Sequence, residues 1–512
     1  MNLARRDFLK ATLGGSATLA GLTACGPKKE ARPPNLIVLM ASGWRGRDLG
    51  LFGSSPVETP NLDRLAKQGV LFENAMTNAA VAGASRATFL TGHYPLQHGV
   101  VGNLIPLDPK NGSLGQTLTS RGWRSSFIGT WRLAGFPEQN YARTGPGRQG
   151  FDEYWAQILS PFKHFQSVIA SDGAPPRVVE RYMPTEQVDL AIDRLDRHAL
   201  SGTNDPFFFF LSFGAPHPPF DQVPTAFKEK YASVDLELPP NWEASDEEPG
   251  GDEVGTLEKR RDYYAACTAL DHEIGRLVTA LDERRLTEDT LIVFLSDHGM
   301  LLGEHGLFHA QQPFDESIRI PLIARWPGTI PAGKRSDVLI SMVDLNPSIL
   351  SLMGAPVSTT IKGRDLSNAF RGELGADPEW IYLQEILGIG PLNLYDTFSW
   401  RGIRTKTHLY AEDLAGAWLL YDMERDPYQR SNLVGRRKVQ TIERRLARDL
   451  RRQYADLFED YLTPLEHLES IGQLQRMRQI LAEQLGGQVR AKQARVLRTY
   501  LMEGSSWTNP RY

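Results

Sequence analysis

The chain has 512 residues, of which 41% are hydrophobic and 23% charged, and this ordinary globular usage excludes a largely disordered, collagenous or coiled-coil protein. Its 57 basic and 61 acidic residues give a net charge of −4, so composition gives no electrostatic argument for a nucleic-acid partner. Beyond the N-terminus, no apolar run reaches the roughly 18 residues of a membrane-spanning helix, so none is expected.

The first 24 residues are predicted to be an export signal. An arginine pair at positions 5 and 6 precedes a modestly apolar stretch from Ala11 to Ala24, which is typical of a twin-arginine signal. The Leu-Thr-Ala-Cys sequence ending at Cys25 resembles a lipobox, in which Cys25 becomes the lipidated N-terminus. The alternative is a plain cleaved signal with a chance cysteine. Lipidation predicts a lipoprotein at the cell envelope, on its periplasmic or external face, with residues 25–34 as a tether.

Cysteine usage is consistent with export of an already folded protein. If Cys25 carries lipid, Cys267 is the one remaining cysteine and no intrachain disulfide can form. Cys267 lies in an apolar helical stretch, so we expect it to be buried in the core.

Residues 35–375 are predicted to form one α/β domain. Asn35–Met40 is an apolar run without alternation, which indicates a buried strand. Thr59 as a cap and Pro60 at the first helical position predict a helix over 61–68. Apolar residues at helical spacing predict another helix over Glu258–Arg285. Further strands are predicted at Ser126–Ile128, Phe207–Phe213, Leu291–Leu295, Ile318–Trp326 and Val338–Ile340. This alternation predicts a mostly parallel central sheet flanked by helices.

The pattern of apolar and polar residues changes after about residue 375. Short alternating runs predict a smaller α+β subdomain over 376–435, with strands at Ile381–Gln384, Gly402–Arg404, His408–Tyr410 and Trp418–Asp422. Residues 436–512 are predicted to be a helical tail.

The start of this tail is strongly basic. Residues 436–452 contain eight lysines and arginines against Glu443 and Asp449. Ile442, Leu446 and Leu450 share one helical face. Two alternatives stay open: a basic helix that lies on anionic lipid, or an amphipathic helix that packs on the subdomain with its charges in water.

Several short motifs follow one another between about residues 34 and 433. They are Thr59-Pro60-Asn61-Leu62-Asp63-Arg64-Leu65-Ala66, Ala84-Ser85-Arg86-Ala87-Thr88, Ala215-Pro216-His217-Pro218-Pro219, Ser296-Asp297-His298-Gly299, Glu304-His305-Gly306-Leu307 and Leu420-Tyr421-Asp422. In this order they resemble the sulfatase family of the alkaline-phosphatase-like superfamily. The resemblance implies an alkaline-phosphatase-like sandwich. It also implies a hydrolase with a calcium ion, a nucleophile made from Cys or Ser by oxidation to formylglycine, and basic groups that hold the sulfuryl oxygens.

The metal-ligand positions depart from that family pattern. The two adjacent aspartates expected after the first strand fall on Ser42 and Gly43, while the second pair survives as Asp297 and His298. Because calcium prefers six or more oxygen ligands, we expect no bound metal cofactor. Calcium is expected only if the protein is an active enzyme with a rearranged site.

The nucleophile position departs as well. The family pattern places the nucleophile at Ala82, whose methyl group can be neither oxidised to an aldehyde nor deprotonated. Ser85 and Thr88 are the nearby hydroxyls. In the family the former position is structural, so neither is the expected replacement.

The positions of the family's basic residues also differ in this chain. The family's lysine and histidine after the next strand fall on Thr130 and Arg132, and a further lysine falls near Ala310. An arginine is a poor proton donor because its pKa exceeds about 12. We expect an anion-binding group made of Arg86, Arg132, His217 and His298 instead.

Two more arginines follow the first strand. Arg45 and Arg47 either line the pocket or are loop residues, solvated or paired with Asp48. Taken together, these positions predict a pseudo-sulfatase that binds an anionic or sulfated ligand, or a partner, at the envelope. The alternative is an active sulfuric or phosphoric ester hydrolase with a rearranged active site.

Overall fold

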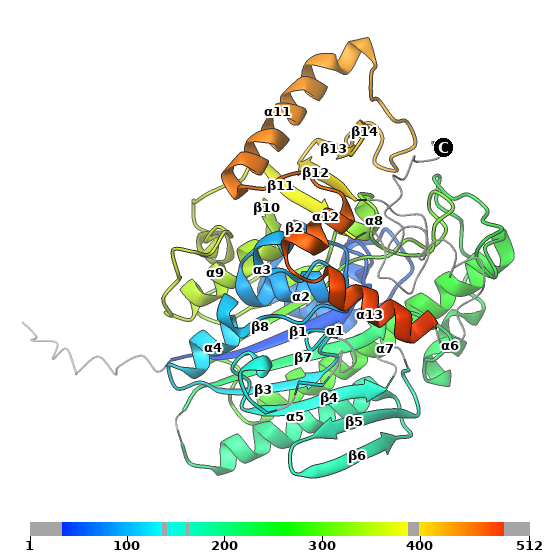
Figure 1. Ribbon diagram of the computed structural model, residues 1–512. Helices are drawn as coiled ribbons and strands as arrows, with labels where there is room; N and C mark the ends of the chain where they lie inside the picture. The colour runs from blue at the N-terminus through cyan, green and yellow to red at the C-terminus, as the bar shows by residue number, and fades with distance from the viewer. Residues whose placement is uncertain are drawn as a thin grey trace, which may run out of the picture.

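The computed structural model describes residues 33–135, 141–142, 144–159, 163–203, 205–387 and 399–485. They form a ten-stranded sheet of order β10-β2-β9-β8-β1-β7-β3-β4-β5-β6 and a four-stranded antiparallel sheet of order β11-β12-β13-β14 (Figure 1). The strands of the large sheet are β1 (Asn35–Ser42), β2 (Val70–Met76), β3 (Arg124–Gly129), β4 (Glu153–Leu159), β5 (Ser167–Ser171), β6 (Ala174–Val179), β7 (Phe207–Pro216), β8 (Thr290–Ser296), β9 (Leu322–Arg325) and β10 (Lys334–Ser341).

The centre of the large sheet is parallel, as the apolar runs predict. β1 lies between β7 and β8, with Leu36 opposite Phe208 on one side and Leu291 on the other. Every residue of β1 is buried, because helices cover both faces of the sheet. The α/β architecture with a mostly parallel sheet is therefore confirmed.

The strand expected over Ile318–Trp326 is wrong in part. The structure forms β9 only over Leu322–Arg325, and this strand runs antiparallel to both β2 and β8. Ile318 instead ends the short helix α8, with its amide bonded to the carbonyl of Phe314. Pro321 lacks an N–H group for the ladder, so the strand begins after it.

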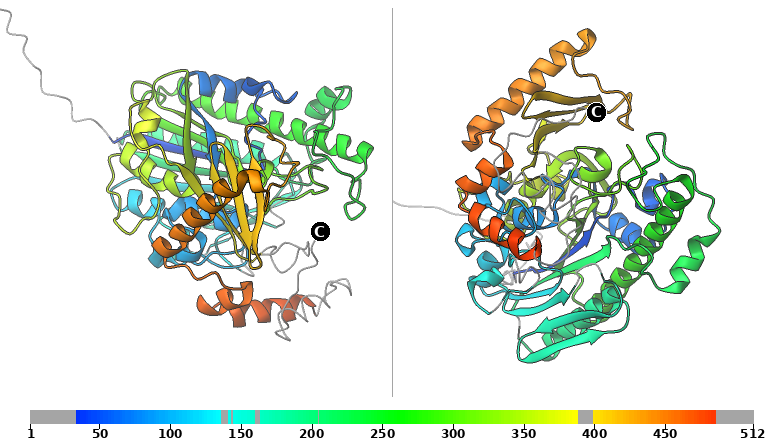
Figure 2. Two further views of the ribbon diagram at one scale, coloured as in Figure 1. Left: turned by 90° about the horizontal axis from the view of Figure 1, so that it is seen from above. Right: turned by 45° about the vertical axis from the view of Figure 1, so that its right-hand side comes forward.

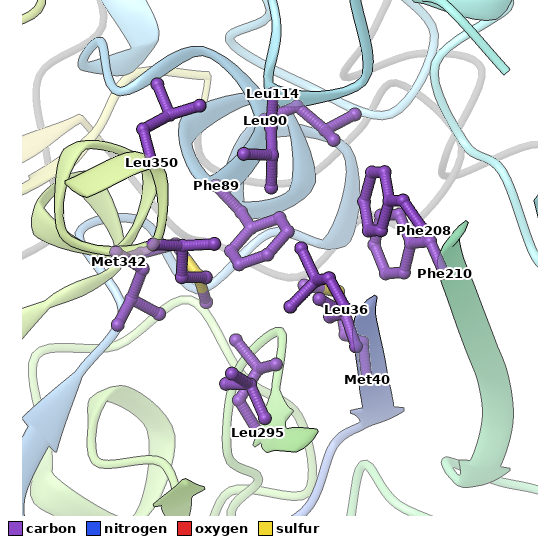
Figure 3. Close-up of a cluster of buried hydrophobic side chains, with 14 of the residues drawn as sticks. Leu36, Met40, Phe89, Leu90, Leu114, Phe208, Phe210, Leu295, Met342 and Leu350 are labelled. Carbon is purple, nitrogen blue, oxygen red and sulfur yellow. The ribbon is translucent and has the colours of Figure 1, made fainter. Parts of the chain in front are cut away.

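The helices form two layers that match the alternation of side chains along β1. Ile37, Leu39 and Ala41 pack with α1 (Pro60–Lys67), α5 (Met183–Leu200) and α7 (Glu253–Glu283). Leu36, Val38 and Met40 face the other layer, made of α2 (Ala82–Thr91), α4 (Leu114–Thr119) and α9 (Met342–Leu352). Figure 3 shows Phe89 of α2 among Leu36, Met40 and Phe210 in this second core.

The cap of one helix and the start of another differ from the sequence prediction. α1 begins at Pro60, but the Thr59 hydroxyl makes no capping bond and donates to Asp63 Oδ1 at 2.9 Å instead. α7 begins at Glu253, five residues earlier than expected, because Asp252 accepts a capping bond from the amide of Gly255. Cys267 on α7 is fully buried, as predicted.

The C-terminal sheet contains all four expected short strands, as β11 (Trp380–Glu385), β12 (Trp400–Thr405), β13 (His408–Asp413) and β14 (Gly416–Asp422). Helix α11 (Gln440–Leu457) lies across its outer face (Figure 2). The remaining helices are α3 (Pro95–His98), α6 (Thr225–Ala232), α8 (Asp315–Ile318), α10 (Ser367–Arg371), α12 (Pro464–Ser470) and α13 (Leu474–Leu485). Among the described helices, none is long and apolar enough to cross a membrane.

Candidate functional site

The predicted site residues converge at the carboxyl edge of the central parallel strands. Ser42 ends β1, His217 follows β7, and Asp297 follows β8. Arg132 lies three residues after β3, and α2 follows β2 at the same edge. Ligands of open α/β sheets bind at this edge, where loops from neighbouring strands meet.

Asp297 lies at the centre of this group and is wholly inaccessible to solvent. Its Oδ2 atom accepts hydrogen bonds from Ser42 Oγ and Arg86 Nη2, both at 3.0 Å. Its Oδ1 atom accepts from the amides of Gly43 at 3.2 Å and His298 at 2.8 Å. Burial raises the pKa of this carboxyl, but His298 and Arg86 outweigh burial, so the pKa lies below its ordinary value.

This donor set does not fit the divalent cation that the family implies. A carboxylate offers about four lone-pair directions, and four protein donors already point at Asp297. Ser42 acts here as a hydrogen-bond donor, and Gly43 has no side chain. Within the described parts of the chain, no group of three or more acidic, histidine or cysteine side chains could hold a metal ion. No chemical step is therefore assigned to a metal at this position.

Ala82, at the family's nucleophile position, is the first residue of α2. Its side chain is 7% exposed and ends at a methyl group. The next amide, that of Gly83, donates to Asn103 Oδ1 at 2.8 Å, so a loop residue anchors the start of the helix. Ala82 supplies the site with apolar contact and no reacting atom.

Neither nearby hydroxyl replaces the nucleophile. Ser85 is fully buried and its Oγ donates to the backbone carbonyl of Asp297 at 2.5 Å. Thr88 Oγ1 lies 3.1 Å from Nε2 of His98, one turn deeper along α2. Burial lowers the pKa of His98 to about 3, which makes it a neutral core histidine. Both hydroxyls therefore serve packing and hydrogen bonding inside the fold.

Two guanidinium groups supply the positive charge of the site. Arg86 is 2% exposed, and its Nε and Nη1 atoms have no acceptor among the described residues. Arg132 is 5% exposed, and burial together with the charge of Arg86 lowers its pKa to about 9. Arg132 has a φ of 64°, a left-handed conformation that costs a non-glycine residue energy and is enriched at functional sites.

His217 contributes polarity rather than charge. His217 and His298 have ring centroids 6.3 Å apart. Burial and the neighbouring His298 lower the pKa of His217 to about 3, so His217 is neutral near pH 7. Its Nδ1 lies 3.1 Å from the carbonyl oxygen of Pro218, which can only accept, so Nδ1 carries the hydrogen and Nε2 acts as an acceptor.

Two of the three replaced basic positions, Thr130 and Ala310, supply no charge to the site. Thr130 is buried, and its hydroxyl donates to Gln157 Oε1 at 3.4 Å. Ala310 is buried as well. Arg132 is thus the one charged residue at these three positions.

Arg45 and Arg47 do not join the anion-binding group. Arg45 pairs with Asp48 at 3.4 Å and with Glu304 at 2.9 Å, and Arg260 approaches the same Glu304 oxygen at 2.8 Å. The pairing with Asp48 is therefore the alternative that the structure supports, with Glu304 as an unforeseen second partner. Burial and the charge of Arg319 lower the pKa of Arg47, and the carboxylate of Asp315 opposes this shift.

Two residues of the site were missed from sequence. Asn103 anchors α2, and His164 Nε2 lies 2.8 Å from the backbone carbonyl of His217. His164 thereby fixes the loop that carries His217. An isolated asparagine or histidine in a loop carries no pattern that predicts such a contact.

A separate cleft of about 600 Å³ opens at the opposite, amino edge of the sheet. Arg325, Gln68 and Arg371 line it, together with the loop after β9. It shares no residue with the group around Asp297.

Comparison with known proteins identifies the family. The model of the sulfatase family matches residues 34–355, and a model described as the C-terminal part of N-sulphoglucosamine sulphohydrolase matches residues 303–456. The chain belongs to the sulfatase family.

The similar sulfatases cover most of this chain. An ulvan-active sulfatase of Formosa agariphila is 32% identical over 438 residues, which is 84% of this chain and 83% of the relative. An N-acetylglucosamine-6-O-sulfatase of Bacteroides thetaiotaomicron is 26% identical over 510 residues, covering 84% of this chain and 88% of the relative. The phosphonate monoester hydrolase of Agrobacterium radiobacter has the same fold, with a TM-score of 0.68 at 23% identity over 83% of this chain and 96% of that one.

The predicted signal, Cys25 and the first part of the tether lie outside the described residues, as does the tail after residue 485.

Proposed function

We propose that this protein is a catalytically inactive sulfatase that binds a sulfated or otherwise anionic ligand. One observation carries the proposal: the carboxylate of Asp297 is saturated by four protein donors, and Arg86 approaches it from the protein side. A cation would have to displace these bonds. The methyl group of Ala82 leaves no nucleophile at the start of α2.

The charges of the site favour an anion. Arg86 and Arg132 carry two positive charges against the one carboxylate of Asp297, because the pKa of Arg132, about 9, keeps its guanidinium charged near pH 7. Guanidinium groups suit the planar, multi-oxygen faces of sulfate, phosphate and carboxylate. The similarity to an ulvan-active sulfatase supports a sulfated glycan as the ligand.

Two measurements test this proposal, namely enzymatic turnover and ligand binding. Purified protein should hydrolyse aryl sulfates and phosphate diesters at background rates, with and without calcium. In calorimetry it should bind the sulfated form of an oligosaccharide in preference to the unsulfated form. Two charge-assisted bonds of about 1.5–3 kcal/mol each give dissociation constants from about tens of micromolar to several millimolar.

A pair of matched variants tests whether Arg132 is responsible for the binding. Arg132→Ala should weaken the preference for the sulfated form, whereas Arg121→Ala, an exposed arginine in the turn before β3, should leave it unchanged. Equal affinity for both forms would contradict an anion-binding role. Turnover well above background would support the alternative, an active ester hydrolase with a rearranged site.

We propose further that the protein is exported by the twin-arginine route and anchored through lipid on Cys25. The order of arginine pair, apolar stretch and cysteine supports this localisation. Cys25→Ala should move the protein from the membrane fraction to the soluble fraction without lowering its melting temperature. A membrane-bound variant would point to an uncleaved signal instead.

A further inference from the structure

Helix α11 has two opposed faces. Leu446, Leu450 and Leu457 are buried against Ile403 and Leu420 of the C-terminal sheet. The opposite face carries five exposed arginines, namely Arg444, Arg445, Arg448, Arg451 and Arg452. At about 100° per residue these arginines fall within an arc of about 120°, centred opposite the leucines. We call these five residues the arginine ridge.

The ridge is little neutralised by the protein. In the described parts of the chain only Arg448 and Arg451 have a carboxylate within 4 Å, at 3.8 Å from Asp449 and 3.9 Å from Glu412. Three further exposed basic residues precede the helix, namely Arg436, Arg437 and Lys438. At a rise of about 1.5 Å per residue, the ridge alone extends the charge over about 12 Å.

The packing of α11 distinguishes between two kinds of anionic partner. A helix that lies in a membrane interface buries its apolar face in lipid. The leucine face of α11 is already occupied by the C-terminal sheet, so the arginines dominate the outward side, with Phe458 as the exposed apolar side chain at the C-terminal end of the helix. A row of guanidinium groups without an insertable apolar face fits an extended polyanion whose sulfate groups can each accept bidentate hydrogen bonds.

We propose that the arginine ridge of α11 is a docking surface for a sulfated polysaccharide chain. None of its residues belongs to the group around Asp297, so the surface goes beyond the proposed function and does not depend on it. The ridge holds the chain by charge, and exposed long-range charges of this kind are screened by salt.

The probe is dextran sulfate, with neutral dextran and phosphatidylserine vesicles as comparisons. The full chain should bind dextran sulfate and not neutral dextran, with an affinity that falls as salt rises. The triple variant Arg444→Gln, Arg448→Gln, Arg451→Gln should bind dextran sulfate at least about tenfold more weakly and with a shallower salt dependence, since polyanion binding scales with the number of charges neutralised.

A matched triple variant removes the same charge elsewhere. Arg64, Lys67 and Arg121 are exposed on the large domain, and replacing all three by Gln should leave dextran sulfate binding unchanged. The ridge variant should keep the affinity of the Asp297 site for a small sulfated oligosaccharide, which separates this proposal from the function proposed above. Both variants should melt at the temperature of the unaltered chain.

Three outcomes would overturn the proposal. They are unaltered binding by the ridge variant, an equal loss in the control variant, and binding to phosphatidylserine vesicles but not to dextran sulfate. The last outcome would assign the ridge to a membrane surface.

Discussion

The guanidinium of Arg86 lies 3.0 Å from the carboxylate of Asp297, and both side chains are almost completely inaccessible to solvent. The charge of the one surviving acidic position is therefore compensated inside the fold. Ser42 completes the arrangement by donating where the family pattern has a carboxylate ligand. Asp297, Ser42 and Arg86 thus form a closed hydrogen-bonded unit, with Arg132 as a second buried positive charge of the site.

Breaking this pair should destabilise the protein strongly. Asp297→Asn leaves the Arg86 charge buried without a counter-charge, which typically costs about 3–5 kcal/mol. Urea unfolding should report the loss. Asp205→Asn removes the exposed partner of Arg124, where the side chains are 47% and 64% accessible, and should cost less than about 1 kcal/mol. Similar losses in both variants would contradict the central role of the buried pair.

Calcium and chelators should not change the stability of the protein. The oxygens of Asp297 are occupied by protein donors, so a cation gains no ligand set there. A ligand that binds only the folded state raises the melting temperature, so thermal melting with calcium or chelator is a direct measure. A rise of several degrees with calcium would mean that the ligands lie elsewhere in the chain.

Anion binding should weaken in alkali. Arg132 has a pKa lowered to about 9, so its guanidinium loses charge as pH rises through that value. His217, with a pKa of about 3, stays neutral across this range. Calorimetry at a series of pH values should therefore show affinity falling above about pH 9, because a lost charge removes a charge-assisted bond. In Arg132→Ala the alkaline fall should disappear; its persistence would assign the titration to another group.

Restoring the nucleophile position alone should not create a sulfatase. In Ala82→Cys the thiol would still lack a cation, and Thr130 and Arg132 would still stand at the family's acid–base positions. Each lost role is typically worth factors of about 10²–10⁴ in rate. Aryl sulfate turnover should stay below about 1% of that of an active sulfatase, because these losses combine. Higher turnover would show that the site is disabled at one position only.

The central sheet was predictable because buried parallel strands appear as uninterrupted apolar runs. Asn35–Met40 and Phe207–Phe213 lie within β1 and β7, and the adjoining motifs placed the candidate site at their carboxyl ends. The prediction of one strand over Ile318–Trp326 was wrong, because apolar composition alone does not separate a helical turn from a strand. Here α8 ends at Ile318, and the strand begins only after Pro321. The direction of β9 depends on tertiary pairing with β8 that no local pattern encodes.

The polar contacts of the site were less predictable. Nothing near Arg45 in the sequence indicates that Glu304, 259 positions further along, accepts its hydrogen bond. His164 and Asn103 act through single hydrogen bonds to the backbone, which have no spacing rule. The missing nucleophile and the missing carboxylate ligand could be predicted from the sequence, because Ala82 and Gly43 lack these groups in any conformation.

The position of β1 in the sheet has a consequence for biogenesis. Asn35, at the start of β1, is bonded to Phe207 and Thr290, which lie 172 and 255 positions away. Such non-local pairing makes folding slow, because long loops must close before any contact is gained. Until β8 has been synthesised, the nascent chain therefore exposes the mostly apolar strand β1 without one of its two neighbours. Under the proposed export by the twin-arginine route, a quality-control step that senses this unpaired strand would act before translocation.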